Sequence, residues 1–139
     1  MRFNTLNKDE EKLRYFMAKE QTPIGKILIQ QNLISTRLIR LLKHFEYESL
    51  EKLKRQTMGR LIKATEHVLP PNKKNLEFIK KLQDYLSLRN ELIHNMDSSV
   101  YIEKGQNELY HKTKLIKKLG NVVLGKSESI FTKLNIKSE

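Results

Sequence analysis

Apolar residues recur every three to four positions along most of the chain, and this spacing predicts amphipathic helices. The stretches that carry it are residues 5 to 21, 22 to 46, 57 to 69, 75 to 97 and 107 to 135. No stretch alternates with a period of two for long enough to predict a strand. The pattern therefore predicts an all-α fold, an up-and-down bundle of four to five helices formed by residues 1 to 139 as a single domain.

Capping residues and prolines mark the expected helix boundaries. Asparagine and threonine side chains accept hydrogen bonds from free N–H groups at a helix start, and proline fits the first turn but not the interior. The expected caps are Asn7, Thr22 and Asn72, and a shorter helix is expected to begin at Thr57. We also expect Asp9, Glu10 and Glu11 in a first turn, Pro23 at a first helical position and Leu69-Pro70-Pro71 as a stop. Residues 47 to 56 are compatible with helix or loop, and residues 100 to 106 are expected to form a connector.

The apolar stripes predict which residues form the core. Residues 1 to 21 are expected to pack on the bundle through Leu13, Phe16 and Met17, and the second helix through a long stripe that includes Leu28. Gln31 and Ser35 interrupt that stripe, either as polar residues satisfied in a helix interface or as the lining of a cleft. Gly120 and Gly125 indicate a bend or close packing in the last helix.

Composition narrows the class of partner. The formal net charge is +11 in 139 residues, which favours polyanions such as nucleic acids, although a lysine-rich solvated surface would give the same count. The chain has no cysteine, so disulfides, thiolate zinc sites and cysteine nucleophiles are excluded. No apolar run has the length of a signal peptide or membrane span, so we expect a soluble cytoplasmic protein.

Arg89 is the residue that points to chemistry. On a helical projection of residues 75 to 97 it lies near the middle of the apolar arc, the expected core face, to which Ile93 also belongs. A guanidinium there needs a carboxylate, a phosphate, water in a cleft or a subunit boundary. Asn90 and His94 lie one turn apart on the edge of that arc, together with Gln83 and Asp97. The three residues Arg89, Asn90 and His94 therefore form a candidate anion-handling site.

Spacing alone does not single out this site. An arginine and a histidine separated by four to six residues occur also at Arg37 and His44 and at Arg60 and His67. Only Arg89 is followed by a small polar residue, and only Arg89 is expected to interrupt an apolar stripe. The histidines have no metal-ligand spacing, and no glycine-rich phosphate loop is present, so no metal or cofactor is expected.

The segment Arg89-Asn90-Glu91-Leu92-Ile93-His94 resembles the Arg, polar residue, variable residues, His signature of the HEPN superfamily, and residues 57 to 62 resemble a segment of small prokaryotic members. The resemblance implies a homodimer in which two Arg/His pairs face each other. Many HEPN proteins are metal-independent endoribonucleases, often toxins or antiviral effectors, and others bind nucleotides or proteins without catalysis. Some carry a tyrosine two residues after the histidine that a partner modifies. Met96 takes that position here and Tyr101 is out of pattern.

The residues fit cleavage of RNA. His94 would transfer the proton of the ribose 2′-OH or of the leaving 5′-oxygen, Arg89 would bind the scissile phosphate, and Asn90 would support either. The expected function is thus a homodimeric HEPN-like endoribonuclease acting on RNA. A protein antitoxin or a regulatory protein is compatible with this function as a further partner. One alternative is a non-catalytic HEPN-like module that binds nucleotides or proteins and acts as a regulator or antitoxin-like partner. The others are a basic helical DNA-binding protein, or Arg89 and His94 as structural residues paired with carboxylates such as Asp97 or Glu91.

Overall fold

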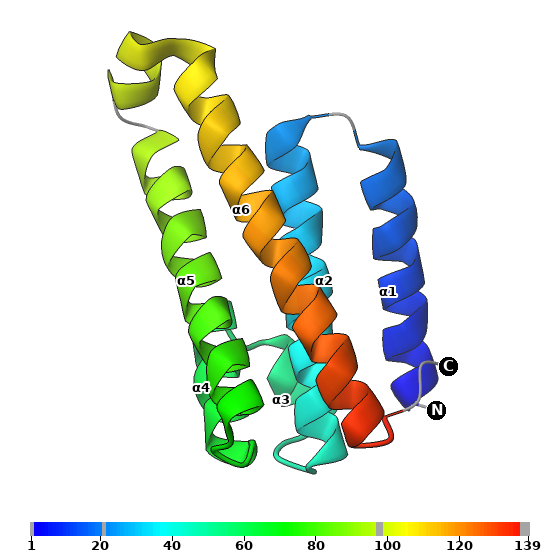
Figure 1. The fold of residues 1–139 in the computed structure, drawn as a ribbon. Coiled ribbons are helices and arrows are strands. Elements are labelled where there is room, and N and C mark those ends of the chain that lie inside the picture. Colours follow the sequence, from blue (N-terminus) through cyan, green and yellow to red (C-terminus); the bar gives the residue numbers. More distant parts are fainter. Residues whose placement is uncertain (1, 21, 97–98, 137–139) are drawn as a thin grey trace.

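The computed structural model describes residues 2–20, 22–96 and 99–136, and for residues 2–7, 23 and 95–109 the backbone alone where it is described. Over these ranges the chain is helical, with no strand (Figure 1). The helices are α1 Arg2–Lys19, α2 Pro23–His44, α3 Leu50–Lys54, α4 Met58–Val68, α5 Lys73–Met96 and α6 Ser99–Lys133. The all-α helical bundle is confirmed, with six helices rather than four to five because the short α3 is separate.

Four of the helices form the core of the bundle. Helix α2 packs on α4 and α6, and α5 packs on the same two helices, so α2 and α5 lie diagonally across from each other. Helix α1 covers the outer side of α2, and α3 closes the lower end in Figure 1. The core is apolar, and its fully buried members include Ile34, Leu38, Leu42, Leu61, Phe78, Leu82, Leu92, Ile116 and Val123. Four-helix packing of this kind buries one stripe of each helix.

Two of the three expected helix caps, Thr22 and Asn72, are confirmed, and Thr57 caps the helix that was expected to begin there. Thr22 Oγ1 accepts a hydrogen bond from Gly25 N at 3.1 Å, and Thr57 Oγ1 accepts one from Arg60 N at 3.3 Å. Asn72 Oδ1 accepts one from Asn75 N at 2.9 Å. In each case the side chain satisfies an N–H group that has no partner within the helix.

The expectations for the first helix were wrong in three respects. Helix α1 begins at Arg2, so Asn7 lies inside it and residues 9 to 11 are not in its first turn. Phe16 is 52% exposed, and Leu13 and Met17 are half-buried. Among the described side chains of α1, those of residues 8 to 19, the buried one is a carboxylate, Glu10. Charge therefore contributes to the attachment of this part of α1.

The connector expected at residues 100 to 106 is also wrong, because α6 begins at Ser99 and continues through these residues. One glycine such as Gly105 costs about 1 kcal/mol in a helix interior, which the continuous hydrogen-bond ladder of a long helix tolerates. Residues 47 to 56 contain the short helix α3, capped by Ser49.

Helix α4 is too short to cover the whole length of α5. Gly59, near the start of α4, lies 3.6 Å from the Leu86 side chain if a Cβ is placed on it, whereas α5 continues to Met96. The upper ends of α2 and α5 therefore lack a fourth helix between them (Figure 1). We call these upper ends, which carry Leu28 and Gln31 on α2 and Arg89 and Ile93 on α5, the open corner.

Side chains at the open corner have the properties expected of an incomplete core. Leu28 and Ile93 are 48% and 42% exposed, so both were wrongly expected to be buried. The Oε1 atom of Gln31 is buried and has no hydrogen-bond partner among the described residues, which contradicts its interpretation as a satisfied interface residue. Ser35 is half-buried. The absence of α4 at this level explains why Leu28 and Ile93 are exposed.

The close packing expected at Gly120 is confirmed, and it gives a stability prediction. A Cβ at Gly120 would lie 2.2 Å from the side chain of Gln30. Gln30 has little freedom to move, because its Nε2 donates to Lys117 O at 2.9 Å and to Asn121 Oδ1 at 3.0 Å. We expect Gly120→Ala to lower the free energy of unfolding by about 1–3 kcal/mol, measured by urea denaturation.

Gly125 provides the matched control on the same helix. A Cβ there meets nothing within 4 Å, so the close packing expected at this glycine is wrong. Gly125→Ala should raise the free energy of unfolding by up to about 1 kcal/mol, since alanine is the better helix former. Equal effects of the two substitutions would contradict the assignment of close packing to Gly120.

Candidate functional site

Arg89 lies where the apolar periodicity placed it, on the core side of α5 and at the open corner. Its side chain is half-buried. Its Nε atom is buried and has no hydrogen-bond partner among the described residues. A buried N–H of a cation that donates to nothing costs more than 1 kcal/mol, so this donor calls for an acceptor beyond the described residues.

One turn below Arg89, a polar network crosses the core. Tyr85 is fully buried, and its hydroxyl donates to Gln30 Oε1 at 3.2 Å. Burial raises the pKa of the Tyr85 phenol well above its usual range, and the nearby positive charge of Arg89 opposes this shift. Tyr85 therefore stays protonated and keeps its hydrogen bond to Gln30. Both side chains are neutral, and Arg89 is the cation one turn above them.

Asn90 lies on the outer side of the same helix, in a groove between α4 and α5. The side chain is exposed and lines a hollow of about 530 Å³. The groove also presents Arg60 and Lys63 from α4 and the polar side chains Thr57, Gln83 and Ser87. No carboxylate is among its lining residues. This groove is therefore a surface of hydrogen-bond donors and positive charge.

His94 is exposed and continues the row of Gln83, Ser87 and Asn90 toward the open end of α5. It lies about 140° around the helix from Arg89, with Ile93 between them. Asn90 and His94 thus share a face, whereas Arg89 leaves α5 on the neighbouring side. In one copy of the chain, Arg89, Asn90 and His94 all lie near the open corner, but the side chains of Arg89 and His94 point in different directions.

Arg89 could instead be a structural residue paired with Asp97 or Glu91, and one of these two carboxylates does not pair with it. Glu91 is exposed and pairs with Lys112 of α6, at 3.1 Å, rather than with Arg89. Asp97 lies outside the described residues, as do the side chains of Met96 and Tyr101.

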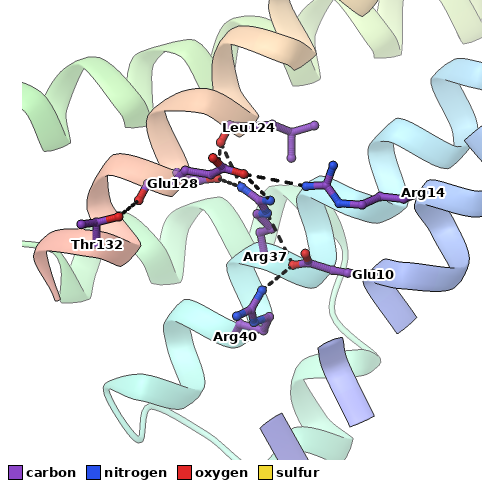
Figure 2. A network of polar contacts seen from close by, with 8 residues as sticks. Glu10, Arg14, Arg37, Arg40, Leu124, Glu128 and Thr132 are labelled. Carbon is purple, nitrogen blue, oxygen red and sulfur yellow. Dashed lines mark hydrogen bonds and ion pairs between the residues drawn. The ribbon is translucent and has the colours of Figure 1, made fainter. Parts of the chain in front are cut away.

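A second cluster, which the sequence did not predict, lies where α1, α2 and α6 meet (Figure 2). Arg40 donates to Glu10 at 2.8 Å, and Arg37 Nε lies 3.4 Å from the same carboxylate oxygen. Arg37 also donates to Leu124 O, to Ser127 Oγ and to Glu128 at 2.8 to 3.0 Å. We call Glu10, Arg37, Arg40 and Glu128 the ion network.

This network corrects the expectation that Arg89 is the arginine that interrupts a buried stripe. Arg37 and Arg40 are 5% and 3% exposed, more buried than Arg89. Both guanidinium groups lie against the Phe131 ring, at 5.9 and 4.9 Å from its centroid. The adjoining hollow of about 290 Å³ is lined by as many glutamates as arginines. Because carboxylates, a carbonyl and a hydroxyl already meet the guanidinium groups, we interpret this cluster as the attachment of α1.

Within the described residues, no three histidine, aspartate or glutamate side chains gather closely enough to bind a metal ion. In the same part of the chain, no helix combines the length and apolar character that a membrane span requires.

Comparisons of the chain with protein-family models, with curated proteins and with solved structures find no match. The resemblance to the HEPN superfamily therefore rests on residues 89 to 94 and 57 to 62 of the sequence. What they do must be argued from the geometry of the open corner and of the groove between α4 and α5.

Proposed function

We propose that this protein binds RNA at the open corner and cleaves it as a HEPN-like, metal-independent endoribonuclease. The observation that carries the proposal is the state of Arg89 at a level of the bundle that α4 leaves uncovered. Its Nε is buried without a hydrogen-bond partner among the described residues, as are those of Arg37 and Arg40, but unlike these two it pairs with no described carboxylate. A phosphate oxygen is the acceptor that best satisfies a guanidinium, since it accepts two parallel N–H donors and neutralises the charge.

The groove between α4 and α5 supports RNA as the source of that phosphate. It leads from Arg60 and Lys63 past Ser87 and Asn90 toward the exposed ring of His94, and its lining has no acidic residue. Lysine, arginine and small polar side chains make most contacts to nucleic-acid backbones. A strand lying in this groove would bring one phosphate to the open corner.

Two copies of the corner would supply the residues that transesterification requires. His94 removes the proton from a ribose 2′-OH, the 2′-oxygen forms a bond to the adjacent phosphorus, and the bond from phosphorus to the 5′-oxygen breaks. Arg89 stabilises the negative charge that builds on the phosphoryl oxygens. A second imidazole protonates the 5′-oxygen, so the products are a 2′,3′-cyclic phosphate and a 5′-OH.

The second imidazole is the reason to propose a homodimer. Arg89 and His94 of one copy point to different sides of Ile93, so the base and the acid are best supplied by two copies joined at the open corner. Leu28 and Ile93, which are apolar and exposed there, would be buried by such a contact. Multi-angle light scattering at micromolar concentration should give twice the mass of 16.5 kDa. A monomer would contradict the shared site.

The test of function is cleavage of a labelled single-stranded RNA in EDTA. We expect a product with a 2′,3′-cyclic phosphate, and no cleavage when the nucleotide before the scissile bond is 2′-deoxy, since that substrate lacks the nucleophile. Cleavage that requires a divalent ion, or that proceeds at the deoxy position, would contradict the proposed reaction.

A non-catalytic RNA-binding module is the second candidate. It is favoured by the position of His94, which is exposed and for which no hydrogen bond to another described residue orients the imidazole. A catalytic histidine commonly has such a partner. Tight binding of the same RNA without any cleavage by the dimer would favour this second function.

A further inference from the structure

A second hollow lies on the other side of α4 from the groove. It has a volume of about 430 Å³ and is formed by α4, α3 and the turn that follows α2. Two aromatic rings form its corner. Tyr47 and His67 have ring centroids 6.3 Å apart and planes inclined at 63°. Neither ring is covered, since Tyr47 is 46% exposed and His67 is also exposed.

The backbone holds Tyr47 in this exposed position. The turn after α2 has Glu46 in the left-handed region at φ 53°, Glu46 N donates to Lys43 O at 3.0 Å, and Tyr47 N donates to Leu42 O at 3.1 Å. These two bonds form a Schellman motif, which fixes the chain at a helix C-terminus. A large aromatic residue is therefore presented to solvent on a backbone that loses little freedom when it binds a ligand.

Positive charge connects this hollow to the groove. Arg60 and Lys63 line both, so the outer face of α4 is a basic ridge between them. A ridge one helix wide spans about 10–12 Å. The acidic residue in the lining is Glu48, and it is already engaged, because it accepts from Ser49 N at 3.0 Å and lies 3.8 Å from Lys52 Nζ.

We propose that the corner of Tyr47 and His67 is a subsite in which one unpaired base of single-stranded RNA stacks, while the backbone crosses Arg60 and Lys63 from the groove. This inference rests on the proposed RNA function. Stacking on aromatic side chains accepts any base, because every base has a π-face, and it requires an unstacked base, which a duplex does not offer. The subsite thus selects single-stranded over double-stranded RNA and sets no base sequence.

The test is binding by fluorescence anisotropy with a 5′-fluorescein 12-nucleotide RNA in a His94→Ala background, where the probe stays intact. Tyr47→Ala should weaken binding about 5- to 150-fold, whereas Tyr47→Phe, which keeps the ring, should bind like the parent. Tyr110→Ala, which removes another exposed ring from α6, is the matched control and should have no effect. The RNA annealed to its complement should bind more weakly and without dependence on Tyr47.

Unchanged affinity in Tyr47→Ala, or an equal loss for the duplex, would overturn the subsite. The result is separable from the proposed reaction, since cleavage is measured on the unaltered chain. If RNA affinity depends on Tyr47 but the unaltered chain does not cleave RNA, the subsite is retained and the endoribonuclease is rejected. If the chain cleaves RNA but affinity does not depend on Tyr47, the endoribonuclease is retained and the subsite is rejected.

Discussion

Replacing Glu10 with alanine is expected to lower the free energy of unfolding by about 3–5 kcal/mol and to release α1 from the bundle. The carboxylate is buried between Arg37 and Arg40, whose side chains are 6% and 3% exposed. Without it, two positive charges would remain inside the protein beside the Phe131 ring, and only Glu128, 65% exposed, would stay as a counterion. The loss is the cost of unpaired buried charge rather than of one hydrogen bond.

Two measurements check this expectation. Urea denaturation gives the loss of stability, and limited trypsin digestion should cut after Lys19 sooner than in the parent chain, because a released α1 exposes its junction with α2. Glu11→Ala, at the exposed neighbouring position, is the control and should change stability by less than about 0.5 kcal/mol. If Glu10→Ala and Glu11→Ala behave alike, the ion network does not hold α1.

The charge mechanism predicts a strong coupling between the residues. With Arg37 and Arg40 both replaced by methionine, Glu10→Ala should cost much less than in the parent chain, because no buried cation is then left unpaired. An undiminished cost in that background would attribute the role of Glu10 to packing instead.

The ion network could not be predicted from the sequence because its members are far apart along the chain. Glu10 lies 30 residues before Arg40, and Arg37 lies about 90 residues before its partners on α6. A helical projection assumes one buried face, whereas α2 contacts α1, α3, α4 and α6 and therefore buries its charged face as well. Two arginines one turn apart on such a central helix are the signal that would have found it.

Local chemistry predicted most of the fold. Thr22, Thr57 and Asn72 cap helices where expected, because capping needs only residues adjacent in sequence. The expectation that Leu28 and Ile93 are core residues is wrong for a different reason, because it depends on which helix covers which face. Periodicity places these side chains on the apolar side, and only the length of α4 decides that nothing covers them. Arg89, which the sequence indicated as an arginine in an apolar stripe, is half-buried at the same end of α5.

Replacing His94 with alanine is expected to reduce RNA cleavage by about 10²- to 10⁴-fold while leaving RNA binding unchanged. The ring is exposed, and no hydrogen bond to another described residue involves it, so its removal should not disturb the bundle. His44→Ala is the matched control. His44 is exposed and ends α2, at the other end of the bundle from the C-terminal end of α5 that carries His94, so this variant should cleave like the parent. A contaminating ribonuclease would be active in every preparation. Loss of cleavage in His94→Ala, but not in His44→Ala, would therefore also exclude a contaminant.

Arg89→Lys separates phosphate binding from proton transfer in the same assay. Lysine keeps the positive charge at the open corner but loses the planar pair of donors, so cleavage should fall by about 10²- to 10³-fold at saturating RNA with little change in affinity. His94→Ala and Arg89→Lys in one chain should be little worse than the more damaging single change, because both act on one transition state. If neither substitution slows the reaction, cleavage does not occur at the open corner. A loss in Arg89→Lys alone would leave the arginine as the phosphate ligand and require a proton acceptor other than His94.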